Sequence, residues 1–424
     1  MSLDRLLGPS SPHPQRTKQP YAPTRRISPA TSLLTPISRV ELAQCQTSVN
    51  PLRTRPPLPG TGGAPPAAAG LPAQPQGPLP PPPQQVGQRK RPNQDTGGAL
   101  MTHKRPRANG DTRTVADHYN ARPNTDRESR LDSPIIGLKS FNNWIKTVLI
   151  AKFGRHESER EKPLIRVLDL GCGKGGDLQK WGKAGTSEYI GIDLAAVSIE
   201  QARSRHAGLR GKAFHASFFA LDCFESSIEE VLDPSYFDPQ PFDIVSMQFC
   251  MHYALETEAK ARQMLENVAR FLRPGGVFIG TIPDANNLFA HLDASAEAAA
   301  SDPSLNPLVF GNSVYSVKFD SRDPPSSASP YGHRYTFFLQ DAVEEVPEYV
   351  VYWDAFVELA AQYGLTPTYV ADFQTIFADE QDDAHFRQLL RRMKVMDEEG
   401  NAEMDEDQLD AAMLYMGFAF VKDG

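Results

Sequence analysis

The sequence has few cysteines and no long apolar run, and both absences narrow the classes of protein to consider. Four cysteines occur among its 424 residues, and no two of them have the spacing of a metal-ligand or redox pair. We therefore expect a reduced intracellular compartment, with no disulfide framework and no structural zinc. No apolar run reaches transmembrane length and the N-terminus lacks a signal-peptide core, so no membrane association is expected. Internal repeats are absent as well.

Residues 1–113 have few aromatic residues and no sustained apolar periodicity. They hold 22 of the 37 prolines, including the run PLPPPP at 78–83. Such a segment cannot bury enough apolar surface to offset the entropy lost on ordering, so we predict that it is a disordered extension. The remaining residues, 114–424, are enough for one large α/β domain with insertions.

The two parts carry opposite charge. Residues 1–113 have 15 Lys and Arg against 4 Asp and Glu, a net charge of +11, whereas the remainder has 29 against 48, a net charge of −19. A basic extension suggests contact with nucleic acid or a transport receptor, and the basic clusters at 88–92 and 103–107 are similar to a nuclear localisation signal. The alternative is a solvated basic linker. An acidic domain does not suit broad binding of a phosphate backbone, so an RNA substrate would have to be held by a short terminal structure.

The folded part alternates apolar strands with helical periodicity. Strands are predicted at 164–170, at 189–193, ending near 220–222, at 242–249 and at 273–283. Helices are predicted at 141–153, 176–183, 197–206 and 257–273. This order predicts a doubly wound, mostly parallel sheet with ligands at the carboxyl ends of its strands. Residues 291–330 are rich in Ala, Ser and Pro, and the stretch SRDPPSSASP at 321–330 indicates a flexible insertion. A strand and an amphipathic helix are expected within 348–365, and a final strand at the C-terminus.

A glycine loop, GCGKGGD at 171–177, follows the first of these strands directly. Gly171, Gly173 and Gly176 have the spacing G-x-G-x-x-G, and Asp193 follows about twenty residues later. The spacing alone fits a dinucleotide equally well, and a tight strand-to-helix turn without a ligand is the structural alternative. Asp169 before the loop and Asp177 at its end favour S-adenosylmethionine, because two negative charges repel a pyrophosphate but attract a sulfonium and an ammonium group.

The strings VLDLGCGKGGDLQKW at 167–181 and YIGIDLAAVSIEQAR at 189–203 resemble the cofactor motifs of eukaryotic, and in particular fungal, mRNA cap guanine-N7 methyltransferases. Further segments resemble that family in the same order: HYN at 118–120, FNNWIK at 141–146, FDIVSMQFCMHYALE at 242–256, RPGGVFIGTIPD at 273–284, FGNSVYSVKF at 310–319, VPEYVVY at 346–352 and GFAF at 417–420. The resemblance covers essentially all of 114–424. It implies a Rossmann-like class I methyltransferase fold, with a mostly parallel seven-stranded sheet and cap-binding insertions.

The resemblance implies a set of residues that hold S-adenosylmethionine and its product S-adenosylhomocysteine. These are Lys146, Asp169, Gly171, Asp177, Asp193, Asp222, Cys223 and Gln248. Lys146 matches the lysine that meets the methionine carboxylate, Asp193 the acid on the ribose, and Asp222 the acid near the adenine amino group. Cys223 departs from the family, which usually has Ser there, so a backbone contact is expected to remain without the hydroxyl contact.

A second implied set holds the cap: Asn142, Asn143, Lys174, Arg205, His252, Tyr253, Pro283, Glu348 and Tyr415. Lys174 and Arg205 match positions that face the triphosphate, and Asn142 matches a polar position close to both ligands. The pocket for the guanine is matched by His252, Tyr253, Pro283, Glu348 and Tyr415. Aromatic rings can stack on the base, and Glu348 can accept hydrogen bonds from the guanine N1–H and N2–H₂. Each residue has a structural alternative, such as a solvated lysine for Lys146 or a core histidine for His252.

The implied reaction is methyl transfer to N7 of the cap guanine of mRNA. Since N7 has a lone pair and no proton, no general base, no covalent catalyst and no metal are expected, and catalysis would come from positioning and electrostatics. The implied setting is the nucleus, with the capped mRNA 5′ end and the RNA polymerase II capping machinery as partners of a monomer. The alternatives are a methyltransferase of another RNA position or of a small molecule, an NAD-dependent oxidoreductase, and a noncatalytic RNA-binding scaffold.

Overall fold

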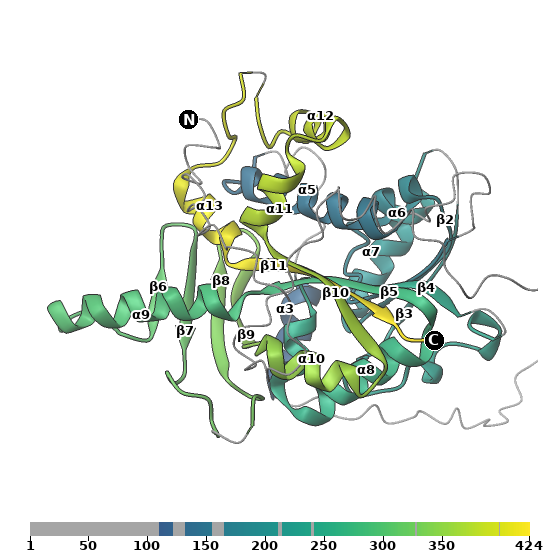
Figure 1. Cartoon of the computed structure of the whole chain (residues 1–424), viewed down its shortest axis with the longest axis horizontal. Coiled ribbons are helices and arrows are strands. Elements are labelled where there is room, and N and C mark those ends of the chain that lie inside the picture. Colours follow the sequence, from purple (N-terminus) through teal and green to yellow (C-terminus); the bar gives the residue numbers. More distant parts are fainter. Residues whose placement is uncertain are drawn as a thin grey trace, which may run out of the picture. The chain divides into compact units, whose positions relative to one another are not determined.

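The computed structural model describes residues 110–121, 132–154, 165–210, 214–238, 241–326, 329–397 and 399–424. Seven strands form a central sheet in the order β10-β11-β5-β4-β1-β2-β3 (Figure 1). They are β1 (Ile165–Leu170), β2 (Thr186–Asp193), β3 (His215–Ala220), β4 (Phe242–Gln248), β5 (Leu272–Pro283), β10 (Leu365–Asp372) and β11 (Tyr415–Lys422). The strands β3, β2, β1, β4 and β5 pair in parallel, whereas β11 is antiparallel to both of its neighbours. The predicted mostly parallel, seven-stranded sheet is confirmed.

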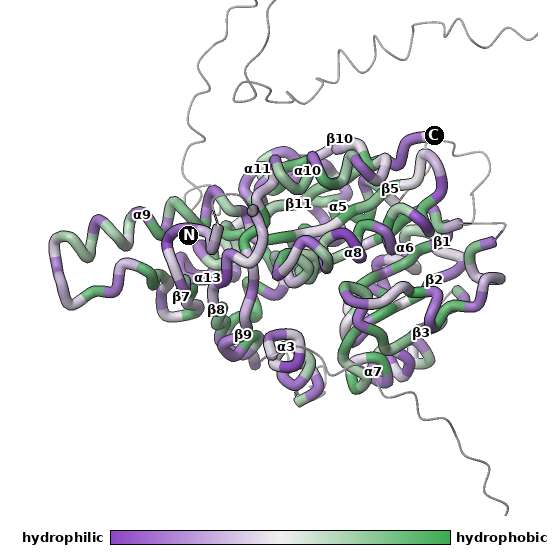
Figure 2. The backbone as a smooth tube through the Cα atoms, turned by 90° about the horizontal axis from the view of Figure 1, so that it is seen from below, coloured by the Kyte–Doolittle hydropathy of each residue, from purple (hydrophilic) through white to green (hydrophobic). Residues whose placement is uncertain are grey.

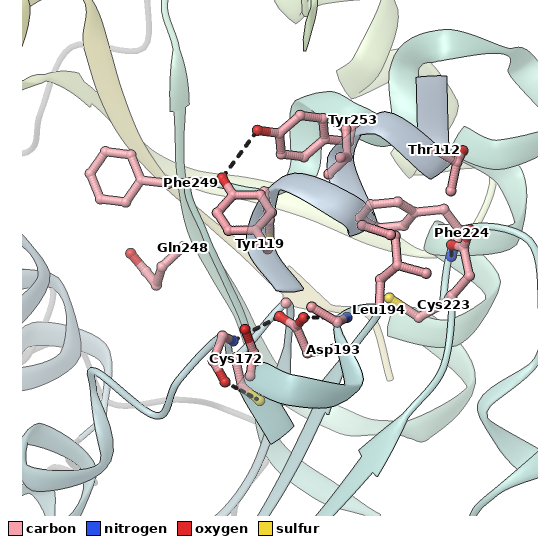
Figure 3. A pocket seen from close by; sticks show the side chains of 18 of the residues that line it. Thr112, Tyr119, Cys172, Asp193, Leu194, Cys223, Phe224, Gln248, Phe249 and Tyr253 are labelled. Atoms are coloured by element: carbon pink, nitrogen blue, oxygen red, sulfur yellow. Dashed lines mark hydrogen bonds between the residues drawn. The ribbon is translucent and has the colours of Figure 1, made fainter. Parts of the chain in front are cut away.

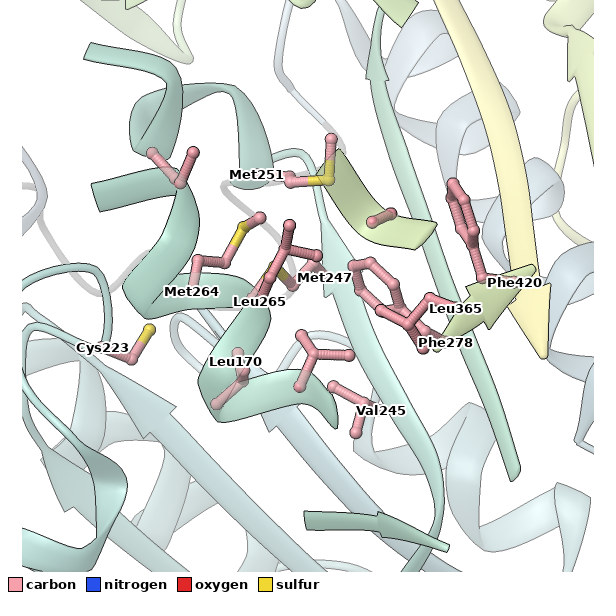
Figure 4. Packing of buried hydrophobic residues seen from close by; sticks show 14 of the residues in the cluster. Leu170, Cys223, Val245, Met247, Met251, Met264, Leu265, Phe278, Leu365 and Phe420 are labelled. Atoms are coloured by element: carbon pink, nitrogen blue, oxygen red, sulfur yellow. The ribbon is translucent and has the colours of Figure 1, made fainter. Parts of the chain in front are cut away.

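Helices cover both faces of this sheet because its strands bury side chains on both faces. Val167 packs on one face with the helices α6 (Leu178–Ala184) and α7 (Ala196–Ala207), and Leu168 packs on the other with α8 (Glu258–Phe271) and α10 (Trp353–Ala361). Figure 4 shows Val245, Met247 and Phe278 packed against Met264 and Leu265 of α8. Three short 3-10 helices lie in the connections: η3 (Ile228–Glu230), η4 (Pro234–Tyr236) and η5 (Met251–Glu256).

Helix α5 (Ile136–Phe153) crosses from this sheet to a second core. Its side chains Phe141, Trp144, Ile145, Val148 and Leu149 are fully buried, which confirms the face predicted from helical spacing. The second core also includes the helices α11 (Phe373–Glu380), α12 (Ala384–Arg392) and α13 (Glu406–Met413).

The Ala-, Ser- and Pro-rich segment 291–330 contains regular structure up to Phe319. The described residues of 321–330, where we predicted a flexible insertion, form neither a helix nor a strand of a sheet. Helix α9 (Ala285–Ser301) runs from the end of β5 away from the central sheet, with hydrophilic and hydrophobic residues alternating along it (Figure 2). A four-stranded antiparallel sheet follows, of β6 (Val309–Gly311), β7 (Tyr315–Phe319), β8 (Arg334–Leu339) and β9 (Val343–Tyr349). Phe310, Val317 and Phe319 give these short strands a buried face within a segment that is otherwise rich in Ala, Ser and Pro.

Helix α3 (Gly110–Ala121) precedes the domain and contacts β9 and α7. It begins four residues before the domain start expected at 114. None of its residues is fully buried, and polar contacts hold it: Asp111 accepts hydrogen bonds from Arg334 Nε at 2.7 Å and Tyr349 Oη at 2.6 Å. The other residues of the predicted disordered extension, 1–109, lie outside the described residues.

Candidate active site

The glycine loop turns the chain tightly from β1 into α6. Gly171 has a φ of +75°, and a Cβ at this position would lie 2.5 Å from Cys250 Sγ. Glycine is therefore required both for the left-handed backbone and for the close approach of Cys250, which follows β4. The amides of Gly171 and Cys172 donate to the Ile192 carbonyl at 2.7 and 3.1 Å, which ties the loop to the end of β2.

A cavity of about 290 Å³ opens above this loop, which is the size of a small-molecule site. Its floor comes from the residues that follow β1, β2, β3 and β4, at the point between β1 and β4 where the strand order reverses. This is where ligands of doubly wound sheets bind. Helix α3 forms the opposite wall through residues that include Thr112, Val115 and Tyr119 (Figure 3). We call this the cofactor cavity.

Asp193 lies at the end of β2 with its carboxylate fixed by the backbone. It accepts hydrogen bonds from the amides of Gly173 at 2.8 Å and Ala195 at 2.8 Å (Figure 3). Burial raises the pKa of Asp193 above its ordinary value, and burial likewise raises the pKa of Asp222, which caps the next turn through the Phe224 amide. Both carboxylates line the cofactor cavity and can accept hydrogen bonds from hydroxyl or amino groups of a ligand.

Asp169 is the last acid of β1 and is 3% exposed. Tyr189 Oη donates to its Oδ2 at 2.7 Å. Burial, reinforced by the charge of Asp177, raises the pKa of Asp169 to about 7. A cation bound in the cofactor cavity would favour the ionised form of this carboxylate.

Asp177 differs from Asp169 because two lysines neutralise it. Its two oxygens accept from Lys146 Nζ at 2.9 Å and from Lys180 Nζ at 2.7 Å. Although burial alone would raise the pKa of Asp177, the two ammonium groups hold it well below its usual range. The free negative charge that we expected at this end of the loop is therefore compensated. The cluster instead carries one excess positive charge.

A second cavity adjoins the first, and we call it the acceptor cavity. Four residues line both cavities: Tyr119, Lys146, Phe249 and Tyr253. Ligands in the two cavities would therefore lie next to each other and contact the same four side chains, which form a shared wall. Of the residues implied to hold the cap, six line the acceptor cavity: Asn142, Asn143, His252, Tyr253, Glu348 and Tyr415.

Glu348 of β9 is the buried acid of the acceptor cavity, with 3% of the residue exposed. Its Oε2 accepts from Tyr335 Oη at 2.9 Å and its Oε1 from Tyr253 Oη at 3.3 Å. His252 Nε2 lies 3.4 Å from Oε1, but within the described chain neither ring nitrogen makes a hydrogen bond. Asn142 Oδ1 is likewise buried without a partner among the described residues. Buried polar atoms of this kind in a cavity are available to a ligand.

Phe249 stands in the shared wall and was not among the predicted site residues. Its φ of +60° is uncommon for a bulky residue and is held by hydrogen bonds from its amide to Thr281 O and Oγ1 at 3.1 and 3.0 Å. Such backbone strain clusters at functional sites. The position directly after β4 was the available signal, because carboxyl ends of parallel strands face the ligand.

Three of the predicted cap residues do not line either cavity. Lys174 and Arg205 are half-buried on the loop and on α7, and Pro283 pairs with Tyr415 at the end of β5. The predicted cofactor residues Gly171, Cys223 and Gln248 all line the cofactor cavity. In Figure 3, Gln248 and Cys223 stand on opposite sides of Asp193. The structure thus assembles the cofactor set completely and the cap set in part.

No group of three His, Cys, Asp or Glu side chains among the described residues could hold a metal ion. None of the helices in the described ranges is both long and apolar enough to cross a membrane.

Comparison with known proteins gives a consistent picture. A sequence model described as the mRNA (guanine-N(7))-methyltransferase domain matches residues 102–423. The mRNA cap guanine-N(7) methyltransferase of Cryptococcus neoformans is 49% identical over 73% of this chain and 47% of that protein. The Schizosaccharomyces pombe protein of the same name is 45% identical over 78% of this chain and 88% of its own length. The match thus spans less than half of the Cryptococcus protein. Among solved structures, the CcbJ methyltransferase from Streptomyces caelestis has a TM-score of 0.40 at 13% identity, covering 73% of this chain and 96% of that one.

Proposed function

This chain belongs to the mRNA (guanine-N(7))-methyltransferase family, and we propose that it transfers a methyl group from S-adenosylmethionine to N7 of the guanine that caps mRNA. The observation that carries this proposal is the shared wall of the two cavities. A methyl donor in one and a base in the other would be neighbours, because Phe249, Tyr253, Lys146 and Tyr119 line both cavities.

The cofactor cavity fits S-adenosylmethionine by the chemistry of its polar groups. The excess positive charge around Asp177 suits the carboxylate of the methionine part, and the buried Asp169 suits its ammonium group. Asp193 suits the ribose hydroxyls and Asp222 the adenine amino group. When bound, the cofactor supplies an electrophilic methyl group on a sulfonium.

The acceptor cavity fits a guanine base. Glu348 keeps acceptor capacity beyond its two tyrosine donors, and can take hydrogen bonds from N1–H and N2–H₂. Tyr253 and Tyr415 offer aromatic surface beside it. Recognition of one base and its phosphates is also compatible with the net charge of −19 on residues 114–424.

The side chains contribute by binding, orienting and excluding water. Guanine N7 carries no proton to be removed, so we assign no general base and no covalent catalyst. Effective molarity from positioning, together with fixed electrostatics, can supply several kcal/mol of the barrier reduction. Helix α3 covers the cofactor cavity and so limits its contact with solvent.

We further propose that the setting is nuclear, with the capped 5′ end of mRNA as substrate and the transcription-associated capping machinery as a partner. Support comes from the basic clusters at 88–92 and 103–107, from the net charge of +11 on residues 1–113, and from the family itself. Both clusters lie outside the described residues.

The test is a methyl-transfer assay on RNA that ends in GpppN, with the product nucleosides separated. Wild type should form 7-methylguanosine at the cap and should not methylate uncapped RNA. Asp193→Ala should lose cofactor binding, whereas Glu348→Gln should lower turnover at least tenfold while S-adenosylhomocysteine binding stays within about twofold. Glu344→Gln is a matched control on the exposed part of the same strand. Methylation at another position, or equal activity on uncapped RNA, would contradict the proposal.

A further inference from the structure

Lys180, whose side chain is 11% exposed, has been described so far only as a second counter-ion of Asp177. It lies on α6, one turn after Asp177. Its Nζ donates to Asp177 Oδ1 at 2.7 Å and to Asn143 Oδ1 at 2.9 Å. Burial lowers the pKa of Lys180, and the charge of Asp177 opposes that shift. Removing the Lys180 ammonium group from water costs free energy, which its charged and polar partners must offset.

Asp177 alone does not explain two lysines. One ammonium group would neutralise one carboxylate, yet Lys146 and Lys180 each take one of its oxygens. The side chains of Lys180 and Asp177 are 11% and 10% exposed, so water screens this cluster little. The three groups together carry a formal charge of +1 at the wall of the cofactor cavity, within electrostatic reach of the Asp169 carboxyl.

We propose that Lys180 is a positioning residue that makes the cofactor cavity selective for ligands with a carboxylate. By taking Oδ1 of Asp177, Lys180 leaves Lys146 only Oδ2, so Lys146 Nζ keeps capacity for a further acceptor. By adding its own charge, Lys180 prevents Asp177 from cancelling the charge of Lys146. Lys146 lines both cavities. Lys180 therefore fixes Lys146 at the place where the methyl donor and the methyl acceptor would lie next to each other.

The second contact of Lys180 extends this arrangement to the acceptor cavity. Asn143 lines the acceptor cavity, and its Nδ2 donates to the Lys139 carbonyl on α5 at 2.8 Å while its Oδ1 receives Lys180. Helices α5 and α6 are thus joined by a chain of polar contacts that runs from Asn143 through Lys180 and Asp177 to Lys146. The inference rests on the proposed function only in that the natural ligand of the cofactor cavity carries a carboxylate.

Binding of two probes to the full chain tests the inference. S-adenosylhomocysteine carries the amino acid end, and 5′-deoxy-5′-methylthioadenosine lacks it. Removing a unit charge at roughly 10 Å in partly buried surroundings should weaken binding of the charged probe about tenfold. Lys180→Gln should therefore raise the Kd of S-adenosylhomocysteine about tenfold and leave the Kd of methylthioadenosine within about twofold. Lys180→Arg keeps the charge and should restore most of the difference.

Two further variants separate charge from folding. Lys183→Gln removes a positive charge from an exposed position of the same helix and should leave both Kd values unchanged. Asn143→Asp adds a negative charge beside Lys180 without removing it, and should reproduce the selective loss. An equal loss of both probes in Lys180→Gln and Asn143→Asp would indicate a structural role and overturn the inference, as would unchanged binding of both.

The outcomes also separate this inference from the proposed function. If wild type binds S-adenosylhomocysteine selectively through Lys180 but does not methylate capped RNA, only the proposed substrate fails. If wild type methylates capped RNA and Lys180→Gln keeps the full preference for S-adenosylhomocysteine, only the role of Lys180 fails. If wild type does not bind S-adenosylhomocysteine, both are overturned.

Discussion

Cofactor affinity should depend on pH between 6 and 8 because of one residue, Asp169. Burial and the neighbouring charge of Asp177 raise the pKa of this carboxyl to about 7 in the ligand-free protein. An ammonium group beside Asp169 is attracted only by the ionised carboxylate. Ligand binding must therefore remove a proton at low pH, and the proton competes with the ligand.

The expected size follows from the fraction ionised. With a pKa of about 7, roughly one Asp169 in eleven is ionised at pH 6 and roughly ten in eleven at pH 8. If the complex requires the ionised form, the Kd of S-adenosylhomocysteine should be about tenfold higher at pH 6 than at pH 8. Isothermal titration calorimetry in buffers of different ionisation enthalpy should also detect close to one proton released per ligand bound at pH 6.

Asp169→Asn is the control, since it keeps the hydrogen bond acceptor for Tyr189 but cannot ionise. This variant should bind more weakly at pH 8 and lose most of the pH dependence. The pH dependence of the unfolding free energy tests independently whether the pKa of Asp169 is raised in the folded chain. The folded chain holds the proton of Asp169 to higher pH than the unfolded chain, so this residue lowers the unfolding free energy as pH rises from about 4 to about 7. A wild-type Kd that is flat from pH 6 to pH 8, with Asp169→Asn unchanged, would refute the reasoning.

Two substitutions test other parts of the site. Asp111→Asn weakens the contacts of α3 with Arg334 and Tyr349 by about 1 kcal/mol, so the Kd of S-adenosylhomocysteine should rise a few-fold while the melting temperature of the domain changes little. An unchanged Kd would argue against α3 as a wall of the cofactor cavity. Gly171→Ala places a Cβ 2.5 Å from Cys250 Sγ at a φ of +75° and should lower the unfolding free energy by about 1–3 kcal/mol in a urea titration. A loss below about 0.5 kcal/mol would show that Cys250 can move away from the loop.

The sequence alone determined the central sheet and the location of the cofactor cavity. Apolar runs such as 164–170 and 242–249 are local signals, because a strand buried on both faces needs nearly every residue to be apolar. The loop that follows Leu170 can bind only where parallel strands end, so Asp169, Gly171 and Asp193 were predictable from order and spacing. Composition did not indicate the structure of 291–330, an Ala-, Ser- and Pro-rich segment that contains most of helix α9 and the two strands β6 and β7.

Only the tertiary structure decided how the charges of the site combine. The sequence suggested that Asp169 and Asp177 act alike, but Lys146 arrives from α5, thirty-one residues before Asp177, and joins Lys180 in neutralising it. Asp169 forms no ion pair with a lysine among the described residues, and burial together with the charge of Asp177 raises its pKa to about 7. Charge in a buried site depends on every group within a few ångströms, whichever part of the chain it comes from, and that neighbourhood is set by the packing of α5 against the sheet.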